Sequence, residues 1–536
     1  MTVTSKPEQQ CDLVMKGGIT SGVVYPKALT ELASQYRFVN VGGTSAGAIA
    51  AAFAAAAEYN RGGGGFELVD QLPQEIGTRL LSLFQPVKKH KRMFSALLHL
   101  MQGNKVRGYG SLLWKLRSTL KHLPKTYYGF CTGLTQGDPE VPGLSDWLNL
   151  ELERVAGRLD EKEKLPQRPL TFGDLRRRGI VLRTIATDLS KQTPVTLPFP
   201  SRVHMRAEDV DALLPANIAN WLKSENTAED GLVAIPAGDR MPVLLAVRLS
   251  LSFPFLLAAV PIYRRDRTLR LCPEEMRKLR PTWLSDGGIS SNFPIHLFDQ
   301  PLPSRPTFGI SLDEFAPCRQ EPDGADGPGD NRIFLPKTAG QGIQLPINSV
   351  DSVFGFLGAI LAAARNWQDS VQSTLPGYRE RIVHIALKED SEGGVNLNMP
   401  KPLIGKLTHL GHLAGKRINE EFDFDEHRWR RVLSAYAAIE ESFESLHESW
   451  HQAGPESFRD FMLRYRAAMS TDDPVARSYP PADHARFEQL FERMDELATL
   501  AEKMSQNPIR DQWGGRSKPM PRPRPALRLF PSEFVD

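Results

Sequence analysis

The stretch FVNVGGTSAGAIAAAFAAAA, Phe38 to Ala57, decides the fold. Phe38 to Val41 predicts a short buried strand, and the alanine-rich run Ala46 to Ala57 predicts a helix that packs closely on a sheet. Between them, Gly43-Thr44-Ser45-Ala46-Gly47 has the form G-x-S-x-G. A serine on a tight strand-to-helix turn is held exposed beside a helix N-terminus, which favours developing negative charge. Ser45 is therefore a candidate nucleophile, although a turn that only packs a helix on a sheet has the same pattern.

Strand and helix patterns alternate on both sides of this stretch. Cys11 to Met15 predicts a preceding strand, and Val23 to Ala33 has helical spacing. Further strands are predicted at 180–186, 243–247, 282–284, 307–310 and 381–387. This alternation predicts an α/β fold with a parallel sheet between helices.

Other segments differ in composition. Residues 66–164 are mostly helical and charged, which predicts an insertion, and 320–342 is a Gly/Pro/Asp-rich loop. Residues 402–506 show only helical patterns and predict a helical extension. The Pro/Arg-rich tail 507–536 is expected to be disordered. Met241 to Tyr263 is apolar enough to imitate a membrane span, but it contains Arg248 and three prolines, so a buried strand, turn and helix is the better interpretation.

Composition excludes several classes of protein. With 66 Lys and Arg against 63 Asp and Glu over 536 residues, the chain is too balanced to bind nucleic acid through bulk charge. Its four cysteines show no C-x-x-C spacing, which argues against a zinc ribbon and a disulfide framework. The polar first residues lack a secretory signal pattern, so a cytoplasmic location is expected.

A serine hydroxyl needs a base that takes its proton and donors that stabilise the oxyanion. Lys16-Gly17-Gly18 ends the first predicted strand, where bare backbone N–H groups could face the same cleft. Asp286-Gly287-Gly288 ends a later apolar run and supplies a candidate base at the edge where parallel sheets carry active sites. Each motif alone is more often a simple turn.

In chain order, the three motifs are Lys16-Gly17-Gly18, the G-x-S-x-G stretch around Ser45 and Asp286-Gly287-Gly288. Together they resemble the patatin-like phospholipase family. Ala186-Thr187-Asp188-Leu189 and the stretch Val247 to Pro254, with its S-x-S-x-P pattern, are also similar to family signatures. The resemblance covers about residues 10–390. It implies a catalytic domain over that range, with three α/β/α layers around a mainly parallel sheet.

The resemblance also implies a mechanism. Ser45 would form an acyl-enzyme, Asp286 would serve as the base of a Ser-Asp dyad, and the amides of Gly17, Gly18 and Ala46 would form the oxyanion hole. Gly43 and Gly47 would shape the nucleophile elbow, and Gly287 and Gly288 would support the acid. The implied activity is hydrolysis of phospholipid or lysophospholipid esters, as in phospholipase A or lysophospholipase enzymes, without metal or cofactor.

This chain departs from the family pattern in its oxyanion loop. Ile19 stands where the family has a third glycine, and Ser21 stands where it has a cation. Lys16 is a candidate substitute for that charge. Two alternatives therefore stay open: a soluble carboxylesterase or thioesterase that uses the same dyad, and a non-catalytic membrane-associated regulatory protein.

Three other residue sets compete for chemical roles. Asp188 is an alternative acid, although its setting is more typical of a structural turn. His296 would be needed for a Ser-His-Asp triad. His447-Glu448-Ser449-Trp450-His451 matches the H-E-x-x-H zinc motif, but Ser457 occupies the position of a third histidine ligand and the charged helix makes a chance match plausible.

Two basic clusters suit a peripheral attachment to anionic membrane. The first is Lys88 to Arg92, and the second lies in the tail and consists of Arg516, Lys518, Arg522, Arg524 and Arg528. A solvated face beside a core helix explains the first equally well. The sequence leaves a homo-oligomer open.

Overall fold

The computed structural model describes most of residues 7–513. Its longer gaps fall at 96–125, 226–230, 316–329, 338–346, 351–355, 364–372 and 470–483, and single residues or pairs are left out elsewhere. The predicted loop 320–342 lies largely outside the described residues, and the basic tail beyond 513 lies wholly outside them.

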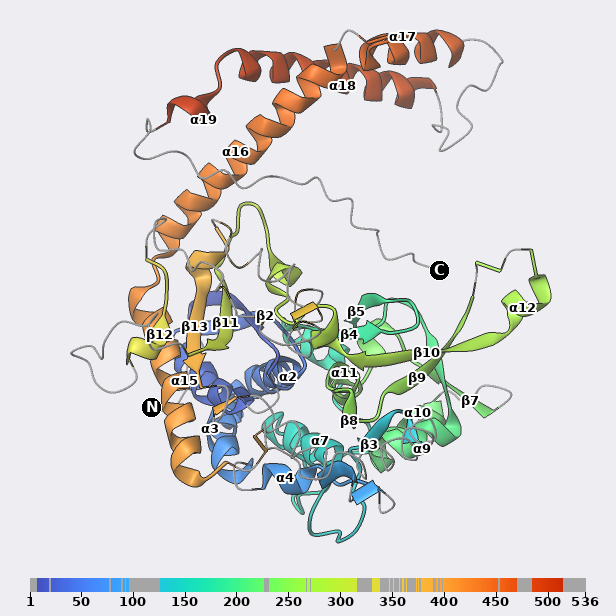
Figure 1. Ribbon diagram of the computed structural model, residues 1–536, viewed down its shortest axis with the longest axis vertical. Coiled ribbons are helices and arrows are strands. Elements are labelled where there is room, and N and C mark those ends of the chain that lie inside the picture. Colours follow the sequence, from blue (N-terminus) through green and yellow to red (C-terminus); the bar gives the residue numbers. More distant parts are fainter. Residues whose placement is uncertain are drawn as a thin grey trace.

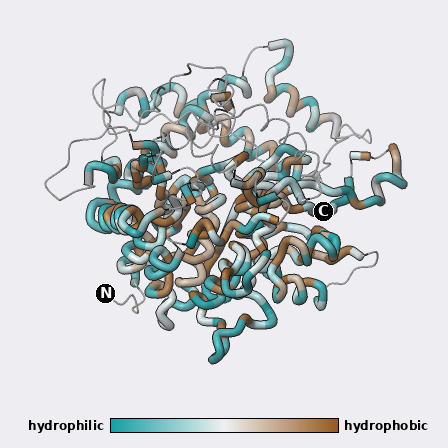
Figure 2. Tube along the Cα trace, turned by 60° about the horizontal axis from the view of Figure 1, so that its bottom comes forward, coloured by the Kyte–Doolittle hydropathy of each residue, from teal (hydrophilic) through white to brown (hydrophobic). Residues whose placement is uncertain are grey.

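Five parallel strands form the middle of one large sheet (Figure 1). In spatial order they are β13 (Ile382–Leu387), β11 (Thr307–Glu314), β1 (Gln9–Met15), β2 (Tyr36–Thr44) and β4 (Val181–Asp188). Buried apolar side chains fill the interior of this body, where hydrophobic chain gathers in Figure 2. The predicted α/β class is confirmed.

The sheet as a whole is mixed. Antiparallel strands extend it on both sides: β12 (Ile333–Phe334), β5 (Thr193–Leu197), β10 (Leu279–Asp286), β9 (Val260–Arg265), β6 (Val203–Arg206) and β7 (Leu232–Ile235). Among the described residues, six of its ten strand pairings are antiparallel. The five central strands are parallel as expected, and the antiparallel strands that join them make the whole sheet mixed.

One strand, β4, has an unusual pair of neighbours along a single edge. Its other edge is occupied by β5, which pairs with Thr184 to Asp188. On the remaining edge, β2 pairs as far as Thr44 with Ile185, and β10 then takes over with Asp286 opposite Ala186. Because each strand has only two edges, β2 and β10 meet end to end there. This meeting point is called the junction below.

Helices cover the sheet on both faces. Neighbouring strand residues point to opposite faces, and a Cβ atom on Gly43 would meet α2 (Ala46–Tyr59), whereas one on Gly42 would meet Leu297 and Phe298. Those two residues lie in η8 (Ile295–Phe298). The α2 side also carries η1 (Ser21–Val24), α1 (Tyr25–Ala33), α3 (Gly65–Ile76), α7 (Leu144–Val155), α11 (Val243–Ser250) and α15 (Lys401–Glu421).

Smaller elements complete the body. They are η2 (Arg61–Gly63), α4 (Leu80–Leu83), α8 (Phe172–Arg177), α9 (Ala207–Leu213), α10 (Ala216–Glu225), η6 (Gly238–Arg240), α12 (Pro273–Arg277), η7 (Gly287–Ile289), η9 (Asp330–Arg332) and η10 (Arg379–Arg381). A second, two-stranded sheet pairs β3 (Gly129–Cys131) with β8 (Phe255–Leu257) in parallel. The described parts of 66–164 are helical apart from β3 and connecting turns.

The strand predicted at 243–247 is wrong, because these residues belong to helix α11. Periodicity alone cannot distinguish a short buried strand from a buried helix. The surrounding segment, Met241 to Tyr263, is largely buried as predicted, except at residues 253–255, and its order is helix first and strands second. None of the described helices is long and apolar enough to cross a bilayer.

The C-terminal extension is helical, as predicted. After α15, the helices α16 (Phe424–His451), α17 (Phe458–Met469) and α18 (His484–Gln506) form an arm that rises from the body (Figure 1). The tail, expected to be disordered from residue 507, begins with the short helix α19 (Ile509–Gln512). The arm is fixed to the body by Arg431, whose guanidinium donates to Asp299 at 3.2 Å and to the Gln300 carbonyl at 2.6 Å.

Close packing of α15 on the N-terminal part of the chain gives a direct test of the fold. A Cβ atom on Gly411 would lie 1.9 Å from the Val24 carbonyl oxygen, whereas one on Gly405 in the same helix would meet nothing within 4 Å. We expect Gly411→Ala to lower the free energy of unfolding by about 2 kcal/mol through overpacking. Gly405→Ala should raise it by about 0.5–1 kcal/mol through helix propensity. Thermal unfolding of both variants measures this, and shifts of the same sign would contradict the packing.

Candidate active site

Ser45 lies on a strained turn between β2 and α2. Its backbone angles, φ 57° and ψ −126°, are rarely adopted by residues other than glycine. The turn is also tightly packed, since a Cβ atom on Gly47 would lie 2.3 Å from the Met15 carbonyl oxygen and one on Gly43 would lie 2.2 Å from the Gly47 carbonyl oxygen. Both positions therefore require glycine. The segment has the geometry that a nucleophile elbow needs.

Asp286 arrives at the same place from the opposite direction. It ends β10 at the junction, it is 3% exposed, and its Oδ1 accepts the Gly288 N–H at 2.7 Å. A Cβ atom on Gly287 would lie 1.9 Å from the Ile185 carbonyl oxygen and 2.7 Å from Cγ2 of Thr44. The turn after Asp286 thus lies directly against the residue that precedes Ser45. The sequence placed Asp286 at the end of a parallel strand, but it reaches this edge on an antiparallel one.

At the junction, the Ser250 side chain binds two backbone groups that neither β2 nor β10 pairs. Its Oγ accepts the N–H of Ser45 at 3.0 Å and donates to the Ile185 carbonyl at 2.6 Å. Two residues later, the Ser252 carbonyl accepts the N–H of Asp286 at 2.9 Å. The end of α11 and the two residues that follow it therefore hold the backbone of both dyad candidates.

Arg248 supports this segment from inside the protein. Its guanidinium donates to Ser252 Oγ at 2.7 Å, to the Ala258 carbonyl at 2.9 Å and to the Thr132 carbonyl at 3.0 Å. All three acceptors are neutral oxygens. Burial lowers the pKa of Arg248 to about 10, which still leaves it protonated at neutral pH. Arg248 is thus a buried cation that stiffens the turn behind Asp286.

The glycine loop after β1 lies beside Ser45. A Cβ atom on Gly17 would lie 3.2 Å from Cβ of Ser45 and 2.4 Å from Oδ1 of Asn292. The Gly17 N–H, however, donates to the Asn292 carbonyl at 2.8 Å, so it reaches an oxyanion only if that bond opens. Ala46 heads α2, where the first N–H groups have no intrahelical acceptor. Gly18 is half-buried next to Gly17, and Ile19 lies outside the described residues.

Lys16 does not supply the missing cation. Its ammonium donates to Asp313 Oδ1 and to the Leu312 carbonyl, both at 2.9 Å, on the neighbouring strand β11. Asp313 also contacts His384 Nδ1 at 2.5 Å. Burial alone would raise the pKa of Asp313, but Lys16 and then His384 outweigh it and hold that pKa well below its usual value. The suggested substitution fails because Lys16 is already part of an ion pair.

The competing acid has a structural role. Asp188 is buried at the end of β4, and its Oδ1 accepts the N–H groups of Ser190 and Lys191 at 3.0 Å each, which is a side-chain-capped turn. His296 lies on η8, ten residues after Asp286. Asn292 follows the Asp286 turn and carries no signal of its own in the motif. Its contacts with Gly17 and with the Cβ position of Gly288, 3.0 Å from Oδ1, make it a central residue of the site.

The H-E-x-x-H motif lies on α16, in the arm, where the rings of His447 and His451 are 5.0 Å apart. No three His, Cys, Asp or Glu side chains in the described part of the chain are placed to hold a metal ion. Within the first basic cluster, His90 is buried against Phe130. Lys88, Lys89 and Arg92 lie outside the described residues, as does the basic tail.

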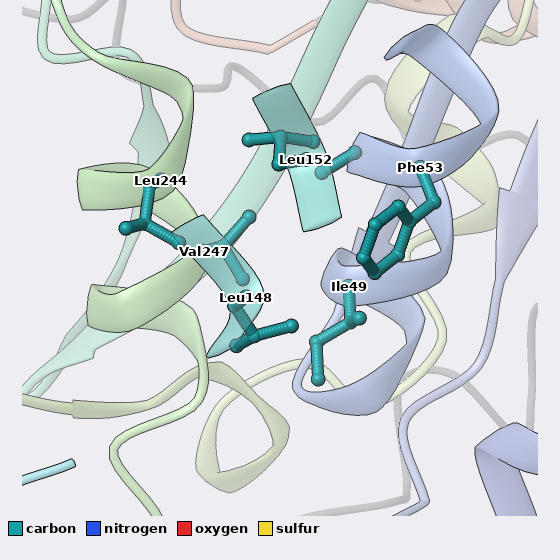
Figure 3. A pocket seen from close by; sticks show the side chains of 7 residues that line it. Ile49, Phe53, Leu148, Leu152, Leu244 and Val247 are labelled. Carbon is teal, nitrogen blue, oxygen red and sulfur yellow. The ribbon is translucent and has the colours of Figure 1, made fainter. Parts of the chain in front are cut away.

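An apolar hollow begins one helical turn from Ser45. It is lined on α2, α7 and α11 by Ile49, Ala52, Phe53, Leu148, Leu152, Leu244 and Val247. Figure 3 shows these side chains converging between the three helices. The hollow thus has an entirely hydrocarbon lining and shares α11 with the residues that hold Ser45.

Comparison with known families decides the classification. Residues 13–299 match the family model described as patatin-like phospholipase, a range that includes the elbow, the junction and Asn292. The chain belongs to the patatin-like phospholipase family. Patatin-like phospholipases act on lipid esters, so membership supports a lipid ester hydrolase.

Two curated relatives and two solved structures are similar to this patatin-like chain. The RpoH suppressor of Rhizobium meliloti (strain 1021) is 32% identical over 98% of this chain and 99% of that protein. The uncharacterized protein YqhO of Bacillus subtilis (strain 168) is 26% identical over 56% of this chain and 70% of its own. VipD from Legionella pneumophila is 15% identical with a TM-score of 0.32, covering 94% of this chain and 89% of its own. The type III effector ExoU is 14% identical with a TM-score of 0.28, and the match covers 95% of this chain and 80% of ExoU.

The Ser250 hydroxyl can be tested separately from the nucleophile. Ser250→Ala would leave the Ser45 N–H and the Ile185 carbonyl without this partner, so we expect it to lower stability by about 1–3 kcal/mol. It should also slow labelling of Ser45 by a fluorophosphonate at temperatures where the variant is fully folded. Ser34→Ala, which removes an exposed hydroxyl bonded to the Glu31 carbonyl, is the control. Labelling at the wild-type rate by folded Ser250→Ala would show that the hydroxyl does not position Ser45.

Proposed function

We propose that this protein is a serine lipid acyl hydrolase that cleaves carboxylic ester bonds of phospholipids or lysophospholipids. Ser45 is the nucleophile and Asp286 is the base of a Ser-Asp dyad. The observation that carries the proposal is the junction, where the residue before Ser45 and the residue Asp286 pair with consecutive positions of β4.

In the first step, Ser45 Oγ attacks the ester carbonyl carbon while its proton passes to the Asp286 carboxylate. The resulting oxyanion accepts hydrogen bonds from the amides of Ala46 and Gly18, with the N-terminus of α2 favouring the negative charge. Gly17 joins them if its bond to Asn292 opens. The bond to the alcohol then breaks, and Asp286 returns the proton to the leaving oxygen.

In the second step, a water molecule attacks the acyl-enzyme while Asp286 takes its proton. The bond between the acyl carbon and Ser45 Oγ breaks, the serine recovers a proton from Asp286, and the fatty acid leaves. The glycines of the elbow and of the Asp286 turn contribute by allowing the two chain segments to approach. No metal or cofactor enters either step.

The hydrocarbon lining of the hollow favours an apolar group beside Ser45. The hollow starts at Ile49, on the same face of α2 as Ser45 and one turn farther on. Its lining contains only apolar side chains, which suit hydrocarbon and reject a polar alcohol group. The hollow is far smaller than an acyl chain, so α2, α7 and α11 must separate before an ester can place its acyl chain there, with its carbonyl carbon near the N-terminus of α2.

Substitution of the dyad tests this mechanism. On vesicles of phospholipid, we expect Ser45→Ala to abolish release of fatty acid and Asp286→Asn to lower kcat by about a thousandfold, because an amide cannot accept the serine proton. His296→Ala should keep most of the activity. Product analysis by mass spectrometry measures all three variants.

The reverse ranking, with Asp286→Asn active and His296→Ala inactive, would contradict the dyad and favour a Ser-His-Asp triad. Activity on soluble short-chain esters but not on vesicles would favour the carboxylesterase or thioesterase alternative. Absence of fluorophosphonate labelling at Ser45 in folded wild-type protein would favour a non-catalytic protein.

A further inference from the structure

A group of exposed apolar side chains lies next to the candidate active site. Tyr128, Leu189 and Phe255 are 44%, 45% and 49% exposed, and Trp283 is half-buried. These four residues are called the aromatic rim. The rings of Tyr128 and Trp283 meet edge to face at 5.0 Å, and the Leu189 N–H donates to the Trp283 carbonyl at 2.8 Å. Phe255 is paired with Gly129, the neighbour of Tyr128.

The aromatic rim is tied to the dyad through the backbone. Trp283 precedes Asp286 by three residues on β10. Phe255 follows Ser252 by three residues, and Ser252 is the residue whose carbonyl holds the Asp286 N–H. Three residues of chain span at most about 10 Å, so both side chains start within that distance of the site.

Two members of the rim are held in a costly backbone conformation. Tyr128 has φ 59° and Phe255 has φ 65°, in the left-handed region that bulky side chains rarely adopt. Because both rings are about half exposed, burial in the core does not offset this cost. Asparagine or glycine would fit the same backbone with less strain. Strain of this kind persists where the side chain itself has a use.

A basic hairpin adjoins the rim. The segment 264–280, which links β9 to β10, contains seven Lys and Arg against three Asp and Glu. Arg265 is exposed, and so is Lys191, two residues from Leu189. Lys278 and Arg280 are exposed too, and both form ion pairs with Glu275. Near the far end of the hairpin, Leu271 is 98% exposed. Figure 1 shows this hairpin, with α12 on it, extending away from the body.

We propose that the aromatic rim and the basic hairpin together dock this protein onto the surface of an anionic lipid bilayer. The aromatic rings and Leu271 enter the headgroup region, where amphipathic rings are favoured, and the cations of the hairpin contact lipid phosphates. This inference rests on the proposed function, because a lipid that reaches Ser45 from a bilayer must leave it close to the site. Docking at the rim shortens the path from the bilayer to Ser45, along which the acyl chain of the lipid is exposed to water.

The two chemical features of the surface favour a membrane over a protein groove. Half-exposed aromatic residues combined with an excess of cations are typical of peripheral membrane attachment. None of its residues belongs to the two basic clusters that the sequence suggested.

Vesicle binding tests the proposal without any need for hydrolysis. In the Ser45→Ala background, binding to vesicles of phosphatidylglycerol and phosphatidylcholine is measured by sedimentation and compared with vesicles of phosphatidylcholine alone. We expect Tyr128→Asn with Phe255→Asn to lower the partition coefficient at least tenfold. Lys191→Glu with Arg265→Glu should lower it on anionic vesicles and remove most of its salt dependence.

Leu490→Asn is the matched control, because Leu490 is 53% exposed on α18 of the arm and should have no part in docking. The asparagine variants relieve backbone strain, so their melting temperature should equal or exceed that of the parent, which separates lost docking from lost folding.

Unchanged binding by both rim and hairpin variants would overturn the proposal. Loss of binding in Leu490→Asn alone would also overturn it, because it would place the docking surface on the arm. A wild-type protein that binds vesicles but releases no fatty acid would overturn the proposed function and leave the docking result intact.

Discussion

Two strands share one edge of β4, and the rest of the site depends on how they meet. β2 must leave that edge after Thr44 so that β10 can take it over at Asp286. The departure of β2 forces Ser45 into a strained turn at the start of α2, and the arrival of β10 leaves no room for a side chain at Gly287. The backbone groups that neither strand can pair are held by Ser250. Strain at Ser45 and the arrival of Asp286 beside it are therefore two consequences of one arrangement.

The segments around the junction are fixed from both sides of the sheet. On the α2 side, α11 presents Ser250, and the buried Arg248 holds Ser252 behind Asp286. On the other side, the chain that leaves Asp286 runs through Asn292 and η8 to Asp299, where Arg381 donates at 2.7 Å and Arg431 of the arm also binds. The helical extension thus reaches the segment that carries the acid, which gives it a physical connection to the site.

Much of this arrangement could be predicted from the sequence because local signals agree there. The G-x-S-x-G stretch between an apolar run and an alanine-rich run indicated the strand, the turn and the helix. The Asp-Gly-Gly stretch indicated a tight turn after an acid. What the sequence could not indicate was the direction from which Asp286 arrives, because an apolar run of this length fits a parallel and an antiparallel strand equally well.

The predictions that were wrong share one cause, because each depended on contacts between residues far apart in the chain. Lys16 seemed available for an oxyanion, but its partner Asp313 lies almost three hundred residues away on β11. The Gly17 amide looked free, but its acceptor belongs to Asn292. Residues 243–247 were expected to form a strand, and only the packing of α11 against α2 and β4 shows why a helix is needed there. Local pattern finds the reacting groups, whereas their hydrogen-bond partners are set by the topology.

A crystal structure of the protein after reaction with a fluorophosphonate would test the central claim most directly. We expect phosphorus bonded to Ser45 Oγ, the phosphonyl oxygen within about 3.1 Å of the Ala46 and Gly18 amides, and the Asp286 carboxylate beside the modified oxygen. Phosphorus on another residue, or an Asp286 carboxylate turned away from Ser45 with a different base in its place, would contradict it.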